Sequence, residues 1–321
     1  TYEKNKIKDT GVEVTEFSFG TSSLGSMPDT YGYEVPEQRA QETLKRFFQG
    51  PVNMLDTSRN YAMGESEKRI GIAIKENGGW PENFVLSTKI DRNMDTLVLD
   101  KKRTRESIEE SLKTLNVDSV DVLFLHDPEY VKDVNDVTKK DGALDELFKI
   151  KEEGLAKAVG LAMGKIDIMF PMLKNWDFDV MINHNRYTLL NREADEMYSY
   201  AHSKNISIFN AAPYAGGVLA KGPSNFKKIT YQDATEEKLA PAREIEKVCK
   251  KYDIEMGAAA LQFSMKDKRI TSTLCGVTSI QSIEKNLAWA NTSIPEEFWN
   301  EVLKLPYSTK DPESERNYTP G

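Results

Sequence analysis

The chain has 321 residues, of which 29% are charged, and its formal net charge is -8 at pH 7. An acidic chain without a lysine- or arginine-rich stripe is a poor partner for nucleic acid or for an anionic membrane. No apolar run reaches the roughly 18 residues that a spanning helix needs, and Thr1–Lys4 lack the apolar core of a signal peptide. We expect Cys249 and Cys275 to be unpaired thiols of a cytoplasmic protein.

Short β-prone runs alternate with longer helical segments along the whole chain. Most of the short runs are continuously apolar, which is typical of parallel strands buried on both faces. The predicted strands are Val14–Gly20, Val52–Asp56, Phe84–Ile90, Val120–His126, Ala156–Ala162, Val180–His184, Ile206–Ala212 and Thr271–Val277. Amphipathic segments between them include Arg39–Phe48, Glu65–Lys75, Thr104–Leu115, Gly142–Glu153, Glu193–Ser203 and Pro241–Tyr252. Eight strands, each followed by a helix, predict one α/β domain over residues 1–321, a closed (β/α)8 TIM barrel rather than an open sheet.

Three segments lie outside this alternation. Asp9-Thr10-Gly11 is a turn signal within Lys6–Val14, which predicts a short N-terminal hairpin that caps the barrel floor. Pro213–Glu236 is long and glycine-rich, and such loops in compact domains are functional or mobile. The tail Leu305–Gly321 is polar and contains three prolines, which favours a disordered end.

Three polar residues end three consecutive apolar strands: Asp56, Lys89 and His126. Tyr61 follows Asp56 by one loop. Taken singly, these residues are explained equally well as a helix N-cap, a surface lysine, a core histidine and a loop aromatic. The carboxyl ends of barrel strands meet at one rim, where the active sites of such barrels lie. We therefore expect the four side chains to form one catalytic group.

These four residue types suit proton transfer at a carbonyl oxygen. A tyrosine has an ordinary pKa of about 10, and the ammonium of Lys89 is expected to lower the pKa of Tyr61. Asp56 would keep Lys89 charged, and a neutral His126 would orient the substrate oxygen. The set predicts general-acid catalysis at a carbonyl carbon that receives a hydride, or the reverse reaction.

Several stretches of the chain resemble the aldo-keto reductase family. Asp56–Glu67 resembles the family signature, in which Asp and Tyr stand five residues apart ahead of Gly-x-Ser-Glu. Further matches are to the lysine strand, the histidine strand, the fifth strand and the cofactor segment after the eighth, at Leu86–Lys89, Asp118–His126, Lys157–Leu161 and Gly276–Leu287. The resemblance covers the chain in order. It implies that Tyr61 is the general acid, that Lys89 and Asp56 tune it, and that His126 orients the substrate.

A narrower resemblance is to the aldose 1-dehydrogenase branch of that family. It rests on His126–Glu129, on residues 142–154 and on Arg186–Leu190. Enzymes of this branch oxidise fucose, galactose or related sugars at the anomeric carbon. The resemblance implies a small carbonyl or sugar substrate and no metal ion.

The family resemblance also implies a nicotinamide cofactor, extended across the barrel mouth. Positions that match cofactor contacts are Gly20, Thr21, Ser22 and Asp56 near the nicotinamide, Pro213, Tyr214, Gly217 and Leu219 along the pyrophosphate, and Gly276, Val277, Thr278, Ser282 and Asn286 near the adenosine. Tyr214 would take the place of the aromatic that stacks on nicotinamide.

The chain departs from the family pattern at three places. Ala162-Met163-Gly164 replaces a Ser-Asn pair that holds the carboxamide, and Asn183 and His184 stand where a glutamine is expected. We expect both to contact nicotinamide, although His184 is also explained as a core histidine. Gly276 and Ser282 replace basic residues that hold the 2′-phosphate of NADP, so NAD is favoured over NADP. Lys285 could partly compensate.

Two other functions are compatible with the same barrel. Lys89 could form a Schiff base, as in barrel aldolases, a reading that leaves Tyr61 unexplained. Alternatively, the chain could be a regulatory barrel that binds cofactor without turnover. The intact set of four rim residues argues against that second alternative.

Overall fold

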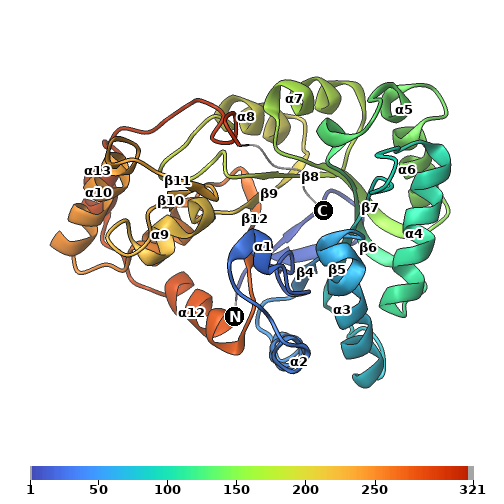
Figure 1. Ribbon diagram of the computed structural model, residues 1–321, viewed down its shortest axis with the longest axis horizontal. Coiled ribbons are helices and arrows are strands. Elements are labelled where there is room, and N and C mark those ends of the chain that lie inside the picture. The colour runs from blue at the N-terminus through green and yellow to red at the C-terminus, as the bar shows by residue number, and fades with distance from the viewer. Residues whose placement is uncertain (1, 317–321) are drawn as a thin grey trace.

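Eight parallel strands form the closed barrel that the strand pattern predicts, in the order β12-β3-β4-β5-β6-β7-β8-β9. The computed structural model describes residues 2–316; Thr1 and the predicted tail residues 317–321 lie outside the described residues. The strands gather at the centre and the helices lie around them (Figure 1). The barrel strands are β3 (Phe17–Gly20), β4 (Met54–Asp56), β5 (Val85–Ile90), β6 (Val120–His126), β7 (Ala156–Ala162), β8 (Val180–His184), β9 (Ser207–Ala211) and β12 (Ile270–Gly276).

Most of the longer helices follow the strands with which they pack. They are α2 (Glu37–Phe47), α3 (Glu65–Glu76), α4 (Lys101–Leu115), α6 (Ala143–Glu152), α7 (Ile166–Asn175), α8 (Asp195–Ser203), α10 (Glu236–Lys251), α11 (Met256–Met265), α12 (Ile280–Ala290) and α13 (Glu296–Val302). Short helical turns lie in the loops at α1 (Pro28–Tyr31), η1 (Tyr61–Gly64), η2 (Pro128–Tyr130), α5 (Asn135–Thr138), η3 (Ala215–Gly217) and α9 (Val218–Lys221).

Several predicted boundaries differ from the structure, and two of the differences have a clear cause. The first predicted strand began too early, because β2 (Glu13–Thr15) pairs antiparallel with β1 (Lys4–Lys6) instead of joining the barrel. Helix α10 begins at Glu236 rather than at Pro241, because the hydroxyl of Thr235 accepts a hydrogen bond from the backbone N–H of Lys238. A threonine N-cap followed by two glutamates is a strong helix start.

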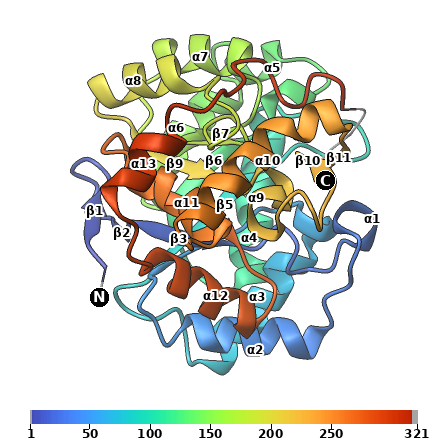
Figure 2. The same ribbon diagram turned by 90° about the vertical axis from the view of Figure 1, so that its left-hand side faces the viewer.

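The predicted hairpin caps the barrel floor. Ile7, Val12 and Val14 are buried and pack with Val122 and Val180 from inside the barrel. Figure 2 shows this hairpin at one end of the barrel, with α1, β10 (Lys228–Ile229) and β11 (Gln232–Asp233) at the other. The floor is therefore closed, and the pocket described below lies at the opposite, carboxyl ends of the strands.

Alternation along each strand decides which side chains reach the pocket. Successive residues of a strand point to opposite faces. Val122 and Phe124 of β6 are in the apolar cluster inside the barrel, so His126 points inward as well. Asp56 is two residues after the inward-facing Met54, and Lys89 is four residues after the inward-facing Val85, so both side chains also point inward. The barrel itself therefore aims the three strand-end residues at one point.

The long segment after β9 is ordered by its own short elements. It contains η3, α9 and the two-stranded hairpin of β10 and β11, and the N–H of Thr230 donates to the carbonyl oxygen of Ala215 over 2.9 Å. This segment folds back over the barrel mouth, where several of its residues line the pocket.

Candidate active site

A cavity of about 530 Å³ opens at the carboxyl ends of the barrel strands. Asp56, Tyr61, Lys89 and His126 all line it. Its volume is in the range of small-molecule sites. The structure thus brings the four predicted residues into one pocket.

Lys89 lies at the centre of a short chain of polar contacts. Its Nζ donates to Asp56 Oδ2 over 2.6 Å, to the carbonyl oxygen of Thr57 over 2.7 Å and to Tyr61 Oη over 2.9 Å. An ammonium has three N–H groups, so all of them are engaged. Ser87 donates to the other oxygen of Asp56 over 2.7 Å. Because Tyr61 Oη accepts from Lys89, the hydroxyl proton of Tyr61 remains available to a molecule in the pocket.

The signature residues after Tyr61 hold the tyrosine in place. Ala62 and Met63 adopt left-handed conformations in η1, which makes a tight turn. Ser66 donates to the carbonyl oxygen of Thr21 over 3.0 Å. Glu67, which is fully buried, accepts from Thr88 over 2.7 Å. The Gly-x-Ser-Glu part of the signature therefore ties the tyrosine loop to the strands on either side.

A residue that the sequence reasoning missed, Asp91, contacts His126. Asp91 Oδ1 lies 2.6 Å from Nδ1 of His126, and Asp91 is fully buried. The other carboxylate oxygen accepts from Ser58 Oγ and, over 2.9 Å, from the N–H of Asn60. Asp91 directly follows β5, so the rule that selected Lys89 also applies to it. We call Asp56, Tyr61, Lys89, Asp91 and His126 the rim cluster.

The electrostatics of the rim cluster differ from two of the expectations. Burial raises the pKa of Tyr61 well above its ordinary value, and Asp56 and Asp127 add to this, so the expected net lowering by Lys89 was wrong. Burial lowers the pKa of His126, but the carboxylates of Asp127 and Asp91 outweigh it and raise that pKa overall. The two carboxylates therefore favour the protonated form of His126.

Most of the residues predicted to contact the cofactor line the pocket. Besides Asp56, these are Gly20, Thr21, Ser22, His184, Pro213, Tyr214, Gly217, Gly276 and Thr278. Five others do not line it: Asn183, Leu219, Val277, Ser282 and Asn286. They lie behind the wall, and all five hydrogen-bond to residues that do line it.

Asn183 faces away from the pocket. Ile182 of β8 points into the barrel, so the next side chain points outward, where Asn183 Nδ2 donates to the carbonyl oxygens of Met163 and Gly164 over 3.0 Å each. The prediction of a nicotinamide contact for Asn183 was wrong, because two neighbouring strand residues cannot share one face.

The other four residues are used within the protein. Asn286 Oδ1 accepts from the hydroxyl of Tyr214 over 2.5 Å, and the N–H of Val277 donates to the carbonyl oxygen of Gly20 over 3.1 Å. Ser282 forms a capping box with Ser279 at the start of α12. Leu219 is fully buried in the apolar core.

Charged residues near α12 also have specific partners. Lys285 Nζ lies 5.3 Å from the ring centre of Trp289, a cation–π contact. Arg39 of α2 donates through Nε to the carbonyl oxygen of Thr278 over 2.7 Å. Arg39 is distant in sequence from this segment, and nothing in the sequence pattern indicated it.

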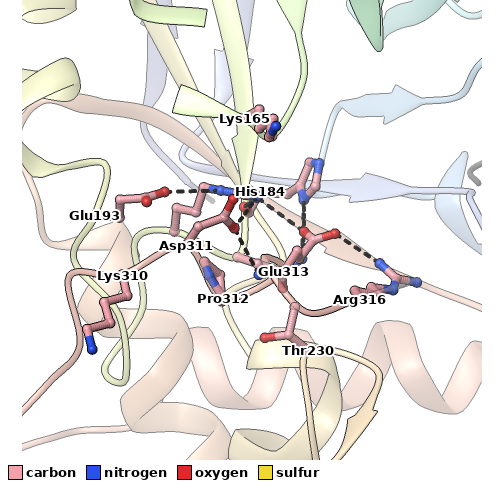
Figure 3. Close-up of polar contacts among 12 residues, drawn as sticks. Lys165, His184, Glu193, Thr230, Lys310, Asp311, Pro312, Glu313 and Arg316 are labelled. Atoms are coloured by element: carbon pink, nitrogen blue, oxygen red, sulfur yellow. Dashed lines mark hydrogen bonds and ion pairs between the residues drawn. The ribbon is translucent and has the colours of Figure 1, made fainter. Parts of the chain in front are cut away.

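His184 is neither a plain core histidine nor an isolated pocket residue. Its Nδ1 lies 3.2 Å from Glu313 Oε1, a residue of the C-terminal tail (Figure 3). Arg186 Nη1 also reaches Glu313 Oε1, over 3.1 Å, and Arg186 Nη2 reaches Asp311 over 2.8 Å. Arg316 contacts the second oxygen of Glu313 over 3.0 Å. We call His184, Arg186, Asp311, Glu313 and Arg316 the tail cluster.

The prediction of a disordered tail was wrong for the described residues up to Arg316. Ser308 and Leu190 share a backbone hydrogen bond of 2.9 Å, and Gln232 Nε2 donates to the carbonyl oxygen of Pro312 over 2.9 Å. The tail therefore runs from α13 across the loop after β8 to the hairpin of β10 and β11. Glu313 and Arg316 line the pocket.

The replacement of the family's Ser-Asn pair now has a steric reason. A Cβ atom at Gly164 would lie 2.7 Å from Arg186 Nη1 and 3.0 Å from His184 Nε2. A larger residue at this position would force these two side chains to shift. The change at Gly164 and the tail cluster therefore belong to one altered wall of the pocket.

Lys89 is poorly suited to Schiff-base chemistry. That reaction needs a neutral, accessible amine, whereas the side chain of Lys89 is 2% exposed and pairs with Asp56.

Among residues 2–316, no helix is long and apolar enough to span a membrane. Over the same described residues, no group of three or more His, Cys, Asp or Glu side chains is arranged to hold a metal ion.

Comparisons with known proteins agree with this geometry. The model of the aldo/keto reductase family matches residues 16–305. L-galactose dehydrogenase of Arabidopsis thaliana is 30% identical over 298 residues, covering 89% of this chain and 87% of that protein. D-threo-aldose 1-dehydrogenase of a Pseudomonas species is 26% identical over 320 residues, and the match covers 92% of this chain and 94% of that protein. An aldo-keto reductase structure from Bacillus halodurans superposes with a TM-score of 0.77 at 20% identity, covering 99% of this chain and 100% of that chain. The chain therefore belongs to the aldo/keto reductase family.

Proposed function

We propose that this NAD(P)-dependent oxidoreductase oxidises an aldose at its anomeric carbon and uses NAD as the hydride acceptor. The observation that carries the proposal is the chain of contacts from Asp56 through Lys89 to Tyr61 Oη, at 2.6 and 2.9 Å. The two named dehydrogenase relatives support a sugar as the substrate. The cytoplasmic location expected from the cysteines stays a prediction.

One wall of the pocket is suited to a dinucleotide. Between Pro213 and Thr278, the described lining residues include Lys221 and Lys228 and no carboxylate. A Cβ atom at Gly276 would meet nothing within 4 Å, so the backbone there is open to a ligand. A cationic wall without acidic residues favours a pyrophosphate. Gly20, Thr21 and Tyr214 would hold the nicotinamide half.

The residues of the rim cluster divide the proton chemistry among them. Bound nicotinamide supplies the hydride acceptor. Tyr61 takes the hydroxyl proton of the sugar when it is a phenolate, and returns a proton in the reverse reaction. Lys89 stabilises the phenolate through its N–H at 2.9 Å, and Asp56 keeps Lys89 charged. Because the pKa of Tyr61 is raised, the rate of oxidation should increase with pH.

Other lining residues suit a substrate with many hydroxyl groups. Asp127, His184, Glu313 and Arg316 line the pocket alongside Tyr130. Charged acceptors and donors make the strongest hydrogen bonds to hydroxyls. A wall of this kind would bind an aldose better than an aliphatic aldehyde.

The proposed preference for NAD rests on the residues that would lie near the adenosine of the cofactor. Neither Gly276 nor Ser282 can balance a phosphate dianion, and Lys285 contacts Trp289. A lysine placed at Gly276 should strengthen NADP binding by about 1–3 kcal/mol, the range for a hydrogen bond to a charged group. The same gain in binding is expected for Ser282→Arg, which also loses the capping box of α12 and should therefore lower the free energy of unfolding by about 1 kcal/mol. NAD binding should change little in either variant.

The test titrates both oxidised cofactors against the native protein and then measures turnover on a panel of sugars and simple aldehydes. NAD-dependent oxidation of one or more aldoses, absent in Tyr61→Phe, is the expected result. Activity confined to aliphatic aldehydes would exclude the sugar substrate. A tenfold preference for NADP would contradict the cofactor proposal, and loss of that preference in Arg39→Gln would then identify Arg39 as the phosphate ligand.

A further inference from the structure

We propose that Asp91 is a positioning residue that keeps His126 doubly protonated, so that a cationic imidazolium, held between two carboxylates, hydrogen-bonds the substrate oxygen. The inference deepens the proposed function, on which its catalytic part rests. The protonation state itself is a property of the free protein.

The geometry places a carboxylate at each ring nitrogen of His126. Asp91 Oδ1 is 2.6 Å from Nδ1, and Asp127 Oδ2 is 3.4 Å from Nε2. A neutral imidazole carries one N–H and would turn a lone pair toward one of the two carboxylates. Only the imidazolium satisfies both. The contact at Nε2 is long, which leaves that N–H able to reach a substrate oxygen in the pocket.

Asp91 is held in its ionised form. Its oxygens accept from Ser58 Oγ, from the N–H of Asn60 over 2.9 Å and from His126. Burial by itself raises the pKa of Asp91, but the charge and hydrogen bond of His126 outweigh it and lower that pKa overall. A protonated Asp91 would have to give up one of these donors. These donors therefore favour an ionised Asp91 beside a protonated Nδ1 of His126.

The charges around His126 lead to the same conclusion. The groups that face it are Asp91 and Lys89 from the end of β5, Asp127 from the end of β6, and Tyr61 from η1, whose ring lies 5.8 Å away. Lys89 is already balanced by Asp56 at 2.6 Å. A neutral His126 would take a positive charge away from the fully buried carboxylate of Asp91, which lies 2.6 Å from the ring, and this is costly in an interior of low dielectric constant.

The consequence is a fixed positive charge beside the reacting oxygen. His126 keeps its proton through the reaction, while the proton that moves is exchanged with Tyr61. An ionised donor makes a stronger hydrogen bond than a neutral one. In the reduction direction, where Tyr61 must be protonated, turnover should therefore decline as pH rises through the pKa of His126, and Asp91 should control where that decline lies.

Nitrogen-15 NMR of the histidine rings tests the protonation state directly. The chain has three histidines, so selective labelling gives three ring signals, which His184→Asn and His202→Gln assign by elimination. In the native, cofactor-free protein, the ring of His126 should titrate with a midpoint above the ordinary value of about 6.5. Asp91→Asn, which keeps the shape of the side chain, should lower that midpoint by about one unit or more.

Two further variants separate a charge effect from a packing effect. Ser58→Ala removes a partner of Asp91 and a contact of 3.3 Å to Nδ1 of His126 but keeps the carboxylate, so the midpoint should move much less than in Asp91→Asn. Asp127→Asn removes the more distant carboxylate and should also lower the midpoint. A neutral His126 ring at pH 6 in the native protein overturns the inference, as does an unchanged midpoint in Asp91→Asn. The native titration decides the question even if Asp91→Asn does not fold.

The pH profile of kcat adds a readout that bears on turnover. For the reduction direction, the alkaline decline should move to lower pH in Asp91→Asn, whereas a purely structural role would lower kcat at every pH alike. If no sugar is turned over, the proposed function fails but the NMR midpoint still stands. If sugars are turned over and the midpoint does not move, only the inference about Asp91 fails.

Discussion

The rim cluster and the tail cluster are both buried ionic networks at the same pocket, but they are assembled differently. Lys89 and Asp56 lie on neighbouring strands, and their contact joins residues 33 positions apart. The contact between Arg186 and Glu313 joins residues 127 positions apart. Both central cations are buried, with 2% and 3% of the side chain exposed for Lys89 and Arg186. The barrel cannot form without bringing Lys89 to Asp56, whereas we expect the tail to be able to leave Arg186 while the barrel stays intact.

This difference separates chemistry from substrate binding. Strand ends are held by the hydrogen-bonded barrel, so groups placed there keep the sub-ångström geometry that proton transfer needs. A docked tail opens with a lower free energy than a barrel strand. Changes in the rim cluster should therefore reduce kcat, and changes in the tail cluster should mainly raise KM.

The largest expected effect is that of Tyr61→Phe. The variant should retain its fold and its cofactor affinity while turnover falls by about 10²–10⁴-fold, the usual contribution of general acid–base catalysis. Steady-state kinetics with fluorescence titration of the cofactor measures both quantities. Retention of more than half of the activity would remove Tyr61 from the mechanism.

Lys89→Met should abolish most turnover and also destabilise the protein. It leaves the carboxylate of Asp56, which is 1% exposed, without its cation, and breaking a buried pair in this way costs about 3–5 kcal/mol. Urea unfolding measures the loss. The double variant Lys89→Met/Asp56→Leu should regain much of the stability without regaining turnover. Equal stability of Lys89→Met and the native protein would contradict the central place of this pair.

Arg186→Met tests the tail cluster. The variant should raise KM for a sugar by about tenfold or more, since a hydrogen bond to a charged group is worth about 1.5–3 kcal/mol, and should change kcat less. Tryptic cleavage after Lys304 or Lys310 should become faster as the tail detaches. Lys238→Met is the matched control, because it removes only the exposed contact of 3.2 Å to Glu315. Loss of kcat at unchanged KM would make the comparison between the two clusters wrong.

The smallest expected effect is a loss of stability at acidic pH, where Glu313 becomes protonated. Burial by itself raises the pKa of Glu313, but His184 and Arg186 outweigh it and lower that pKa strongly. A carboxyl group whose pKa is lower in the folded state stabilises the fold fully above its unfolded pKa of about 4.3 and loses this contribution as pH falls below that value. The tail should therefore dock at neutral pH and detach in acid.

Melting temperatures of the native protein and of Glu313→Gln, measured from pH 7 to pH 3, test this sign. The difference between the two should shrink as the pH falls. A difference that is constant over this range would show that the ionisation of Glu313 does not hold the tail.

Much of the rim cluster was predictable because barrel geometry follows from local pattern. Continuous apolar runs marked the strands, and the residue at the carboxyl end of each run must face the pocket if the inward parity holds. Asp56, Lys89 and His126 satisfy that rule. Asp91 follows the same rule one step beyond β5 and was overlooked because Lys89 already accounted for that strand end. The prediction for Asn183 failed because its side chain is on the outward face of β8.

The sequence by itself thus determined the barrel, the rim and the reaction class, since these depend on hydrophobic period and on residues close to strand ends. The tertiary structure alone decided the rest. A tail with a polar, proline-containing sequence carries no periodic signal, yet Glu313 is ordered because Arg186 and His184 offer it buried counter-charges. The charge of His126 depends on Asp91 and Asp127, which meet it only across closed strands. Long-range electrostatic pairing leaves no mark in a local pattern, because each partner is an ordinary polar residue until the fold brings the two together.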